Sequence, residues 1–334
     1  MGQTAVYVAL SEFCKYDDRP RRVLIEAGFA VRENTLGRRL RREEMFTACR
    51  EVDAVLAGLE PYDAELLTVL PRLRCISRCG VGTDNVDLAR ARQRNIAVLT
   101  TPDEIIEPVA QMTVAMIFAL ARNFPLHYQD LHTGLWRKHT GYLLSEWTIG
   151  LVGFGRIGRR VASYLCPFGP QILVADPYLT PDQLSEDVKI RELRELLTES
   201  DLVSLHAARL QEEGPILGRD QITAMKPGSR LVNTARGHLV DEAALYEALE
   251  SGHLAAAALD VFSQEPYIGP LARLPQVLCT PHVASLTGAS RIAMELRCAK
   301  NIVSFFSGTV VDKDPKQARS TNNSKNTMQG LGEE

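Results

Sequence analysis

The chain has 334 residues, of which 45% are hydrophobic and 24% charged, and this composition excludes a largely disordered protein. Its 38 Lys and Arg against 41 Asp and Glu give a formal net charge of −3, so no excess charge favours nucleic acid or an anionic membrane. No apolar run reaches the ~18 residues of a membrane span. The seven Cys residues show no Cys-x-x-Cys spacing, which predicts reduced thiols in a cytoplasmic protein and no metal site.

Short apolar runs alternate with helical patterns from one end of the chain to the other, which predicts an α/β protein with parallel sheets. In the first hundred residues we expect strands at 6–10, 54–57 and 96–99. A helix from about residue 103 to 121 is apolar on nearly every face, which is typical of a buried helix. The segment 124–147 is expected to be long and irregular, as a functional loop or an interface arm.

The second half of the chain continues the alternation. Six further strands are predicted, at 148–152, 172–175, 202–205, 231–233, 255–259 and 277–279. Six strands with intervening helices fit one dinucleotide-binding domain. A last helix, around 290–306, has no strand of its own nearby, so we expect it to return to the first domain. The polar tail, residues 316–334, is too poor in apolar residues to pack and should be mobile.

A glycine pattern follows the predicted strand 148–152. Gly153, Gly155 and Gly158 are spaced as G-x-G-x-x-G and are followed by a helical pattern, which together predict a pyrophosphate site at a helix N-terminus. Asp176 ends the next predicted strand, about 20 residues past the first glycine. An acid at this distance binds a ribose 2′-hydroxyl and repels a 2′-phosphate, so the pattern predicts NAD rather than NADP.

Three further segments follow predicted strands, at the edge where open α/β sheets bind ligands. Each segment carries one side chain suited to acid–base or anion chemistry: Arg236 in 233–237, Glu265 in 260–266 and His282 in 280–282. An arginine, an acid and a histidine at one sheet edge, beside a dinucleotide loop, predict redox chemistry on a small anionic substrate.

Together with residues 78–87, these motifs resemble the D-isomer-specific 2-hydroxyacid dehydrogenase family, and the resemblance extends from about residue 50 to 310. It implies two doubly wound parallel-sheet domains. A Rossmann NAD-binding domain, 102–286, would be inserted into a flavodoxin-like substrate domain formed by 1–101 and 287–315. The family resemblance also implies a homodimer through the NAD-binding domains, with helix 104–121 and arm 124–147 at the interface.

The resemblance implies a role for each of the three side chains. Hydride would move between nicotinamide C4 and the C2 atom of a 2-oxo or 2-hydroxy acid. Arg236 would bind the carboxylate and polarise the C2 oxygen, because its guanidinium forms two parallel hydrogen bonds. His282 would act as the acid or base at that oxygen, and Glu265 would pair with His282 and orient it.

The resemblance also implies binding contacts elsewhere in the chain. Backbone N–H groups of Val81 and Gly82 would bind the substrate carboxylate, and Asp260 would hold the nicotinamide carboxamide. The full predicted cofactor set is Gly153, Gly155, Arg156, Ile157, Gly158, Asp176, His206, Ala208, Thr234, Ala235 and Asp260. Arg78, just before the Val81–Gly82 turn, would bind a phosphate or phosphonate on the substrate, or else form a structural ion pair.

Two alternatives remain open at this stage. The chain also resembles the phosphite dehydrogenase branch, although Val81 stands where that branch has a lysine, which argues against phosphite itself. Corepressors of the C-terminal-binding-protein type resemble the same family and use NAD to control partner binding. Arg209, which follows Ala208 and stands where the family usually has Leu, is either solvated or in contact with the cofactor.

Overall fold

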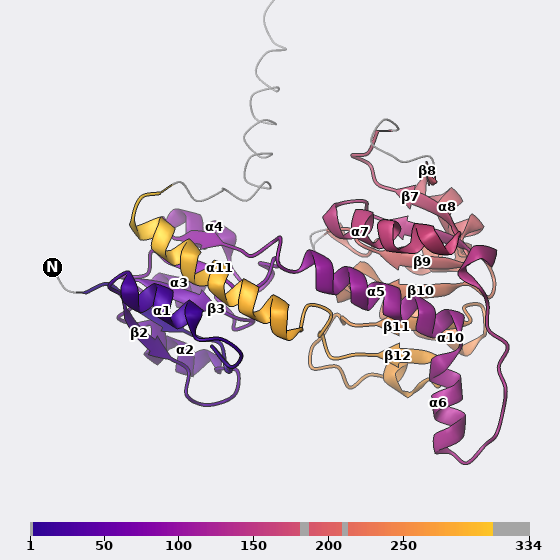
Figure 1. Ribbon diagram of the computed structural model, residues 1–334, viewed down its shortest axis with the longest axis horizontal. Helices are drawn as coiled ribbons and strands as arrows, with labels where there is room; N and C mark the ends of the chain where they lie inside the picture. The colour runs from indigo at the N-terminus through magenta and orange to yellow at the C-terminus, as the bar shows by residue number, and fades with distance from the viewer. Residues whose placement is uncertain (1–2, 181–186, 209–212, 310–334) are drawn as a thin grey trace, which may run out of the picture. The chain divides into compact units, whose positions relative to one another are not determined.

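The structure, a computed structural model, describes residues 3–180, 187–208 and 213–309. The chain divides into two compact units (Figure 1). Unit 1 contains residues 1–105 and 287–334, and unit 2 contains residues 106–286. Unit 2 is therefore inserted into unit 1. The expected boundaries lay after residues 101 and 286. The expected mobile tail, 316–334, lies outside the described residues.

Unit 1 is built on a five-stranded parallel sheet in the order β2-β1-β3-β4-β5. Its strands are β1 (Ala5–Val8), β2 (Ala30–Glu33), β3 (Ala54–Ala57), β4 (Cys75–Arg78) and β5 (Ala97–Leu99). This order is that of flavodoxin-like sheets, so the predicted fold class of this unit is confirmed. The edge strand β2 and the interior strand β4 were not among the predicted strands.

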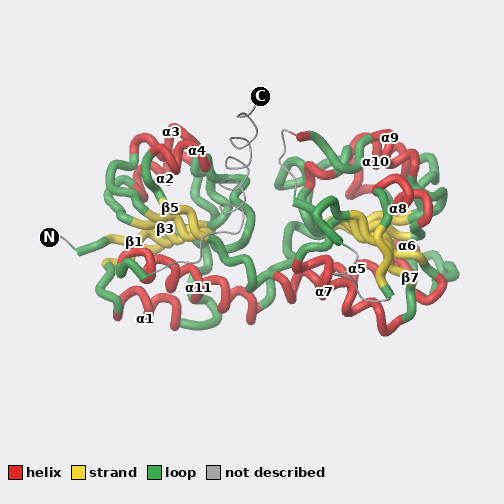
Figure 2. Tube along the Cα trace, turned by 90° about the horizontal axis from the view of Figure 1, so that it is seen from above, coloured by secondary structure: helices red, strands yellow, loops and turns green. Residues whose placement is uncertain are grey.

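Helices cover both faces of this sheet. They are α1 (Arg19–Glu26), α2 (Arg42–Cys49), α3 (Ala64–Val69), α4 (Leu88–Gln93) and α11 (Gly288–Phe306). Helices α1 and α11 pack together on one face, and α2, α3 and α4 lie on the other (Figure 2). Aspartates begin two of them: Asp63 accepts the Leu66 N–H, and Asp87 accepts the Arg90 N–H, each at 2.8 Å. Such caps satisfy backbone donors that a helix start leaves unpaired.

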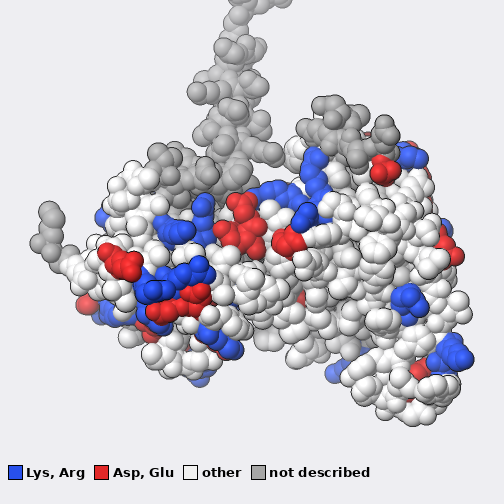
Figure 3. All heavy atoms as spheres, viewed as in Figure 1, with Lys and Arg blue, Asp and Glu red and all other residues white. Residues whose placement is uncertain are grey.

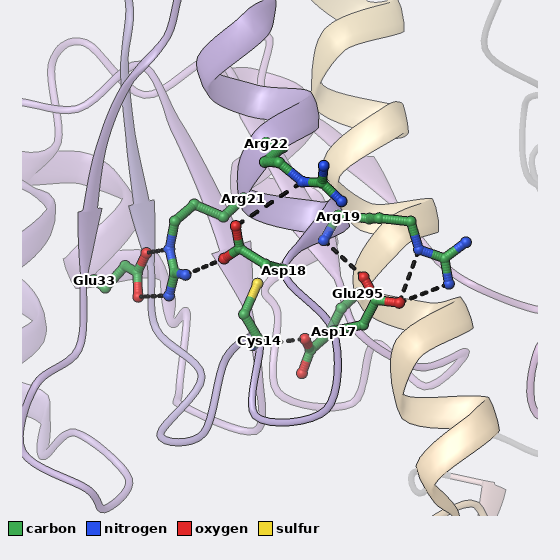
Figure 4. A network of polar contacts seen from close by, with 8 residues as sticks. All are labelled: Cys14, Asp17, Asp18, Arg19, Arg21, Arg22, Glu33 and Glu295. Atoms are coloured by element: carbon green, nitrogen blue, oxygen red, sulfur yellow. Dashed lines mark hydrogen bonds and ion pairs between the residues drawn. The ribbon is translucent and has the colours of Figure 1, made fainter.

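Helix α11 comes from the far end of the chain, as the sequence predicted, and polar contacts hold it in unit 1. The Cys14 N–H donates to Glu295 of α11 at 2.9 Å. Close by, Arg21 of α1 donates to both carboxylate oxygens of Glu33 at 2.6 and 2.9 Å (Figure 4). The buried Glu295 carboxylate thus ties the last described helix to the segment between β1 and α1.

Unit 2 is built on a seven-stranded parallel sheet in the order β12-β11-β10-β9-β6-β7-β8. Its strands are β6 (Thr148–Val152), β7 (Gln171–Ala175), β8 (Val188–Ile190), β9 (Leu202–Leu205), β10 (Arg230–Asn233), β11 (Ala256–Leu259) and β12 (Val277–Cys279). Six of them were predicted, and the short edge strand β8 was not. The chain order reverses between β6 and β9, which is where doubly wound sheets bind dinucleotides.

The helices of unit 2 form a layer on each face of its sheet. They are α5 (Ile106–Ala121), α6 (Phe124–His132), α7 (Arg156–Leu165), α8 (Leu193–Glu199), α9 (Arg219–Ala224) and α10 (Glu242–Glu250). Helices α5 and α7 pack on one face, and α8, α9 and α10 cover the other (Figure 2). One apolar core lies under each layer, so the strands are buried on both faces.

The segment 124–147 is not irregular throughout, and the prediction for it was wrong in part. It begins with helix α6, which has Pro125 in its first turn, and it includes a short 3-10 turn at Leu144–Glu146. Phe124, Tyr128 and Leu131 are spaced as on one helical face, yet all three are 59–65% exposed. Their i, i+4, i+7 spacing was the available sequence signal for this helix, and no part of the described chain covers the face that they form.

No single helix among the described residues is long and apolar enough to cross a bilayer. One bent pair, α5 with α6, passes the same test by length and composition, with a 65° bend between the two helices. On the face drawn in Figure 3, acidic and basic side chains lie next to one another. Arg38 and Glu44, for example, form an ion pair at 2.6 Å.

Candidate functional site

The turn after β6 needs a glycine at its first position. Gly153 has φ +90°, and a Cβ there would lie 2.6–2.7 Å from backbone atoms of His206 and Ala207. The segment after β9 therefore packs directly against this turn. No side chain larger than hydrogen fits between them, which is the physical reason for the first glycine of the pattern.

The other two glycines have different surroundings: one faces open space, and the other packs against the backbone of the turn. Gly155 is exposed, and a Cβ on it would meet nothing within 4 Å. Gly158 lies in the first turn of α7, where a Cβ would be 2.5 Å from the Gly153 carbonyl oxygen. The exposed Arg156 begins this helix, and the partly buried Ile157 packs on the core. The open space beside Gly155, at the N-terminal end of α7, fits a pyrophosphate.

Asp176 lies beside this turn, at the carboxyl end of β7. One carboxylate oxygen accepts the Phe154 N–H at 2.8 Å, and the other accepts the Tyr178 N–H at 3.0 Å. The side chain is partly exposed, and each oxygen keeps a second lone pair. The carboxylate is thus fixed next to the glycine turn and retains acceptors for a hydroxyl, which fits the ribose of NAD.

His206 follows β9 on the opposite side of the turn. Its N–H donates to the Val152 carbonyl at 2.7 Å, and its Nε2 lies 3.0 Å from the Ser204 hydroxyl. Burial lowers the pKa of His206 to about 4, so the ring is neutral at physiological pH. Ala208 is exposed. Arg209, whose role the sequence left open, lies outside the described residues.

The turn after β10 carries Arg236. Asn233 shapes this turn, because its amide oxygen accepts the Ala235 N–H at 3.0 Å and its amide nitrogen donates to the Arg236 carbonyl at 2.8 Å. The Arg236 guanidinium donates to the Ala235 carbonyl at 2.7 Å. The Thr234 hydroxyl is buried against Thr113 of α5 at 2.7 Å, so it is engaged within unit 2.

The structure brings Glu265 and His282 together. Nδ1 of His282 and Oε2 of Glu265 are 2.8 Å apart, and both side chains are about one-third exposed. The second oxygen of Glu265 accepts the Phe262 N–H at 3.1 Å. A carboxylate fixed by a backbone donor and bonded to Nδ1 orients the imidazole so that Nε2 is available for proton transfer.

Asp260 is fully buried below the histidine turn, and its carboxylate is used within the chain. One oxygen accepts the Thr280 hydroxyl at 2.5 Å and the Val283 N–H at 2.9 Å, and the other accepts the Ala284 N–H at 2.9 Å. His282 itself has φ +55°, and its N–H donates to the Asp260 carbonyl at 2.8 Å. Asp260 therefore shapes the turn that carries His282.

Unit 1 carries the predicted substrate turn after β4. The buried Thr101 holds it at Gly80: the Thr101 hydroxyl accepts the Gly80 N–H at 2.8 Å, and the Thr101 N–H donates to the Gly80 carbonyl at 3.0 Å. Arg78 donates to the Cys79 carbonyl and lies over Gly80, where φ is +131° and no Cβ would fit. Val81 is 37% exposed, and Gly82 is partly exposed.

Several residues that shape these turns were missed by sequence reasoning. Asn233 and Thr101 lie within predicted motifs or strand ends, and their turn-forming side chains were the available signal. Thr113 lies on a helix that the sequence showed only as apolar. Glu242, at the start of α10, contacts the 260–266 segment, and nothing in the spacing along the chain indicated that contact.

Residues 114–284, just over half of the chain, match the family model of the D-isomer specific 2-hydroxyacid dehydrogenase NAD-binding domain. The chain belongs to this family. The match spans the glycine turn, Asp176, and the segments that carry Arg236, Glu265 and His282.

Two relatives among the characterised 2-hydroxyacid dehydrogenases differ in substrate. The chain is 36% identical over 281 residues to a glyoxylate reductase of Thermococcus litoralis, covering 79% of this chain and 85% of the relative. It is 36% identical over 255 residues to D-3-phosphoglycerate dehydrogenase of Mycobacterium bovis, covering 75% of this chain and 48% of that protein. The chain thus spans about half the length of such phosphoglycerate dehydrogenases.

Solved structures of the family have the same architecture. The D-lactate dehydrogenase of Aquifex aeolicus, complexed with NAD and lactic acid, superposes with a TM-score of 0.79 at 27% sequence identity. The superposition covers 92% of this chain and 96% of that one. The predicted family and its two-domain α/β fold, with an NAD-binding Rossmann domain, are thereby confirmed.

Proposed function

We propose that this protein is an NAD-dependent 2-hydroxyacid dehydrogenase that acts as a 2-oxoacid reductase. The observation that carries the proposal is the Glu265–His282 pair, joined at 2.8 Å on the same sheet edge as the glycine turn. A histidine oriented by a carboxylate is suited to move a proton, and a dinucleotide site beside it is suited to redox chemistry.

Each residue of unit 2 has a defined part in this proposal. A nicotinamide cofactor held at the glycine turn would supply the hydride chemistry at C2 of the substrate, as donor in the form of NADH and as acceptor in the form of NAD⁺. His282 donates a proton from Nε2 to the C2 oxygen during reduction and removes it during oxidation. Glu265 holds the imidazole by Nδ1 and stabilises its charged form. Arg236 binds the substrate carboxylate and polarises the C2 oxygen, for which its rigid fork of donors is suited.

The cofactor contacts follow the same edge. We propose that the N–H groups at the start of α7 bind the pyrophosphate and that Asp176 binds the adenosine ribose. Thr234 and Ala235 approach the nicotinamide through their backbone, since the Thr234 hydroxyl is already bonded to Thr113. Asp260 contributes by holding the Thr280–Ala284 turn, and its buried carboxylate supports that role more than direct contact with the carboxamide.

In unit 1 we propose that the N–H groups of Val81 and Gly82 bind the substrate carboxylate. Arg78 lies over the same turn and has a guanidinium suited to a second anionic group, phosphate or phosphonate, on the substrate. The two relatives described above act on substrates with and without a phosphate, so Arg78 is the residue to test for that choice.

A panel of 2-oxo acids with NADH tests the activity, and it should include glyoxylate, pyruvate, and phospho- and phosphono-substituted acids. We expect turnover of at least one member, and His282→Ala should lower its kcat by roughly 10²–10⁴-fold. If the protein binds NADH but reduces no member of the panel, the proposed dehydrogenase activity is refuted and an NAD-sensing binding protein is favoured. The remaining alternative is a dehydrogenase that oxidises phosphite or a phosphonate, and assays with NAD and these compounds test it.

We also propose a cytoplasmic homodimer joined through α6 and the chain that follows it. This arm exposes large apolar side chains: Phe124, Tyr128, Leu131, Leu135, Trp136 and Leu143 are 40–84% exposed. Exposed apolar surface of this kind is typical of an interface. All seven cysteines are free thiols, which fits a reducing compartment. Light scattering should report a dimer, and Trp136→Glu should shift it toward monomer.

A further inference from the structure

Glu242 lies outside the predicted site, at the first position of α10. Asp241 caps this helix by accepting the N–H groups of Ala243 and Ala244 at 3.1 and 3.0 Å. The Glu242 carboxylate points away from the helix toward the 260–266 segment. One of its oxygens accepts both the backbone N–H and the hydroxyl of Ser263, at 2.6 and 2.8 Å.

Ser263 lies next to the residue that fixes Glu265. The Phe262 N–H donates to one oxygen of Glu265 at 3.1 Å, and the other oxygen is bonded to His282 at 2.8 Å. The Phe262 ring stacks on Tyr267 with centroids 4.0 Å apart. A continuous path of contacts therefore leads from Glu242 through Ser263 and Phe262 to the carboxylate that orients the histidine.

The turn that carries Arg236 packs against the backbone of Phe262 and Ser263. A Cβ at Gly237 would overlap the Phe262 carbonyl and the Ser263 nitrogen, so the two turns are in direct contact. Residues 263–266 are all exposed. Apolar burial contributes little to their position, and hydrogen bonds and close backbone contacts set it instead. The two hydrogen bonds that Glu242 accepts are of the stronger kind, because their acceptor is a charged carboxylate.

We propose that Glu242 is a positioning residue for the Glu265–His282 pair, acting through its two hydrogen bonds to Ser263. The inference rests on the proposed function, in which that pair moves the proton. Without the Glu242 carboxylate, the Ser263 N–H loses its acceptor and the exposed segment is free to shift. A displacement of about 1 Å at an acid–base group costs up to roughly 10²-fold in rate.

The kinetic test is a double-mutant cycle on reduction of the best 2-oxo acid. We expect Glu242→Ala to lower kcat about tenfold with little change in KM, and Glu242→Gln, which keeps one acceptor oxygen, to lower it less. Glu265→Gln should lower kcat further. If Glu242 acts through Glu265, the double variant should be no slower than Glu265→Gln alone. Losses that multiply would overturn the proposal.

A matched control lies on the same helix. Glu247 is an exposed acid paired with Arg219, and Glu247→Ala should leave kcat unchanged. Ser263→Ala removes only the hydroxyl contact and should produce a smaller loss than Glu242→Ala. It also provides a test if Glu242→Ala does not fold, which thermal unfolding of each variant will show. Wild-type kcat in folded Glu242→Ala would contradict the inference.

A spectroscopic readout separates this inference from the proposed function. The Nδ1 proton of His282, bonded to Glu265, should give a downfield NMR resonance that is absent from His282→Asn. We expect that resonance to broaden or move upfield in Glu242→Ala and to persist in Glu247→Ala. If it responds in this way while no 2-oxo acid is reduced, the proposed function fails and the positioning role stands. If it does not respond in an active enzyme, the positioning role fails.

Discussion

Two glycine-containing turns follow interior strands of the two sheets, and they are built in different ways. The turn after β6 runs directly into α7, and its exposed Gly155 faces open space. The turn after β4 has no helix until α4, and the buried Thr101 binds both backbone groups of Gly80. The first turn is suited to a large diphosphate at a helix terminus, and the second is the one that we propose for a small carboxylate.

The two turns are therefore sensitive to different kinds of substitution. The turn after β6 depends on the absence of side chains, because backbone atoms lie where a Cβ would stand at Gly153 and Gly158, and we assign the open space at Gly155 to the pyrophosphate. The turn after β4 depends on the presence of particular side chains, Thr101 and Arg78, that hold it. Substitutions in and around the two turns test this contrast.

Gly153→Ala should damage the fold. The new methyl would overlap the backbone of His206 and Ala207 at a positive φ, and neither is flexible. We expect a loss of about 3 kcal/mol or more in the free energy of unfolding. Urea denaturation measures it. A variant as stable as the wild type would mean that the segment after β9 does not press on this turn.

Gly155→Ala should spare the fold and weaken the cofactor. A Cβ there meets no protein atom within 4 Å, but it enters the space that we assign to the pyrophosphate. We expect wild-type stability with NADH affinity lower by roughly 10- to 100-fold, or about 1.4–2.7 kcal/mol. Fluorescence titration of NADH gives the Kd. Unchanged affinity would place the pyrophosphate elsewhere.

Thr101→Val should affect the substrate turn alone. Valine keeps the shape of threonine but leaves the Gly80 N–H without its acceptor, at a cost of about 1–3 kcal/mol. We expect a higher KM for 2-oxo acids and an unchanged Kd for NADH, and Thr101→Ser should restore the KM. Steady-state kinetics and NADH titration of the wild type and the two variants decide between this outcome and a general loss of stability, which would change both constants.

His206→Gln should change how stability depends on pH. Burial lowers the pKa of His206 to about 4 in the folded chain, below its ordinary value of 6.5. The unfolded chain therefore binds more protons between these values, and this group's contribution to stability falls as pH drops from about 6.5 to 4. Glutamine does not titrate, so the variant should lose roughly 1–2 kcal/mol less over that interval.

Denaturation curves at pH 7 and pH 4.5 measure this effect for the wild type and the variant. Parallel losses in the two proteins would show that His206 does not titrate on unfolding. Glu107→Gln offers a contrast, since its surface contacts with Arg160, Tyr164 and Gln111 lower the pKa of Glu107 to about 2. That variant should change stability little at either pH, because the carboxylate is exposed.

The sequence predicted well those features that depend on local spacing. The glycine pattern, Asp176 at the end of β7 and nine of the twelve described strands follow from residues close together in the chain. The edge strands β2 and β8 were missed because each is short and one face of an edge strand need not be apolar. The interior strand β4 was missed because Ser77 and Arg78 end its apolar run. Helix α6 was missed although Phe124, Tyr128 and Leu131 have the spacing of one helical face.

Contacts between distant residues escaped prediction for a different reason. Glu242 and Ser263 are 21 residues apart, and only the packing of α10 against the chain after β11 brings them together. Asp260 was assigned to the cofactor by resemblance, while its three accepted hydrogen bonds show a part in the histidine turn. Motifs identify such residues, but the partner of each side chain depends on the fold.

The insertion of unit 2 has a consequence for synthesis of the chain. The last helix of unit 1, α11, packs beside α1, and its Asn301 donates to the Thr100 carbonyl, about two hundred residues earlier. While the ribosome makes residues 106–286, one face of the first sheet therefore lacks half of its cover. Unit 2 can complete its fold first, since all its described helices and strands come from one stretch of the chain, whereas unit 1 gains α11 only when residues 288–306 have been made.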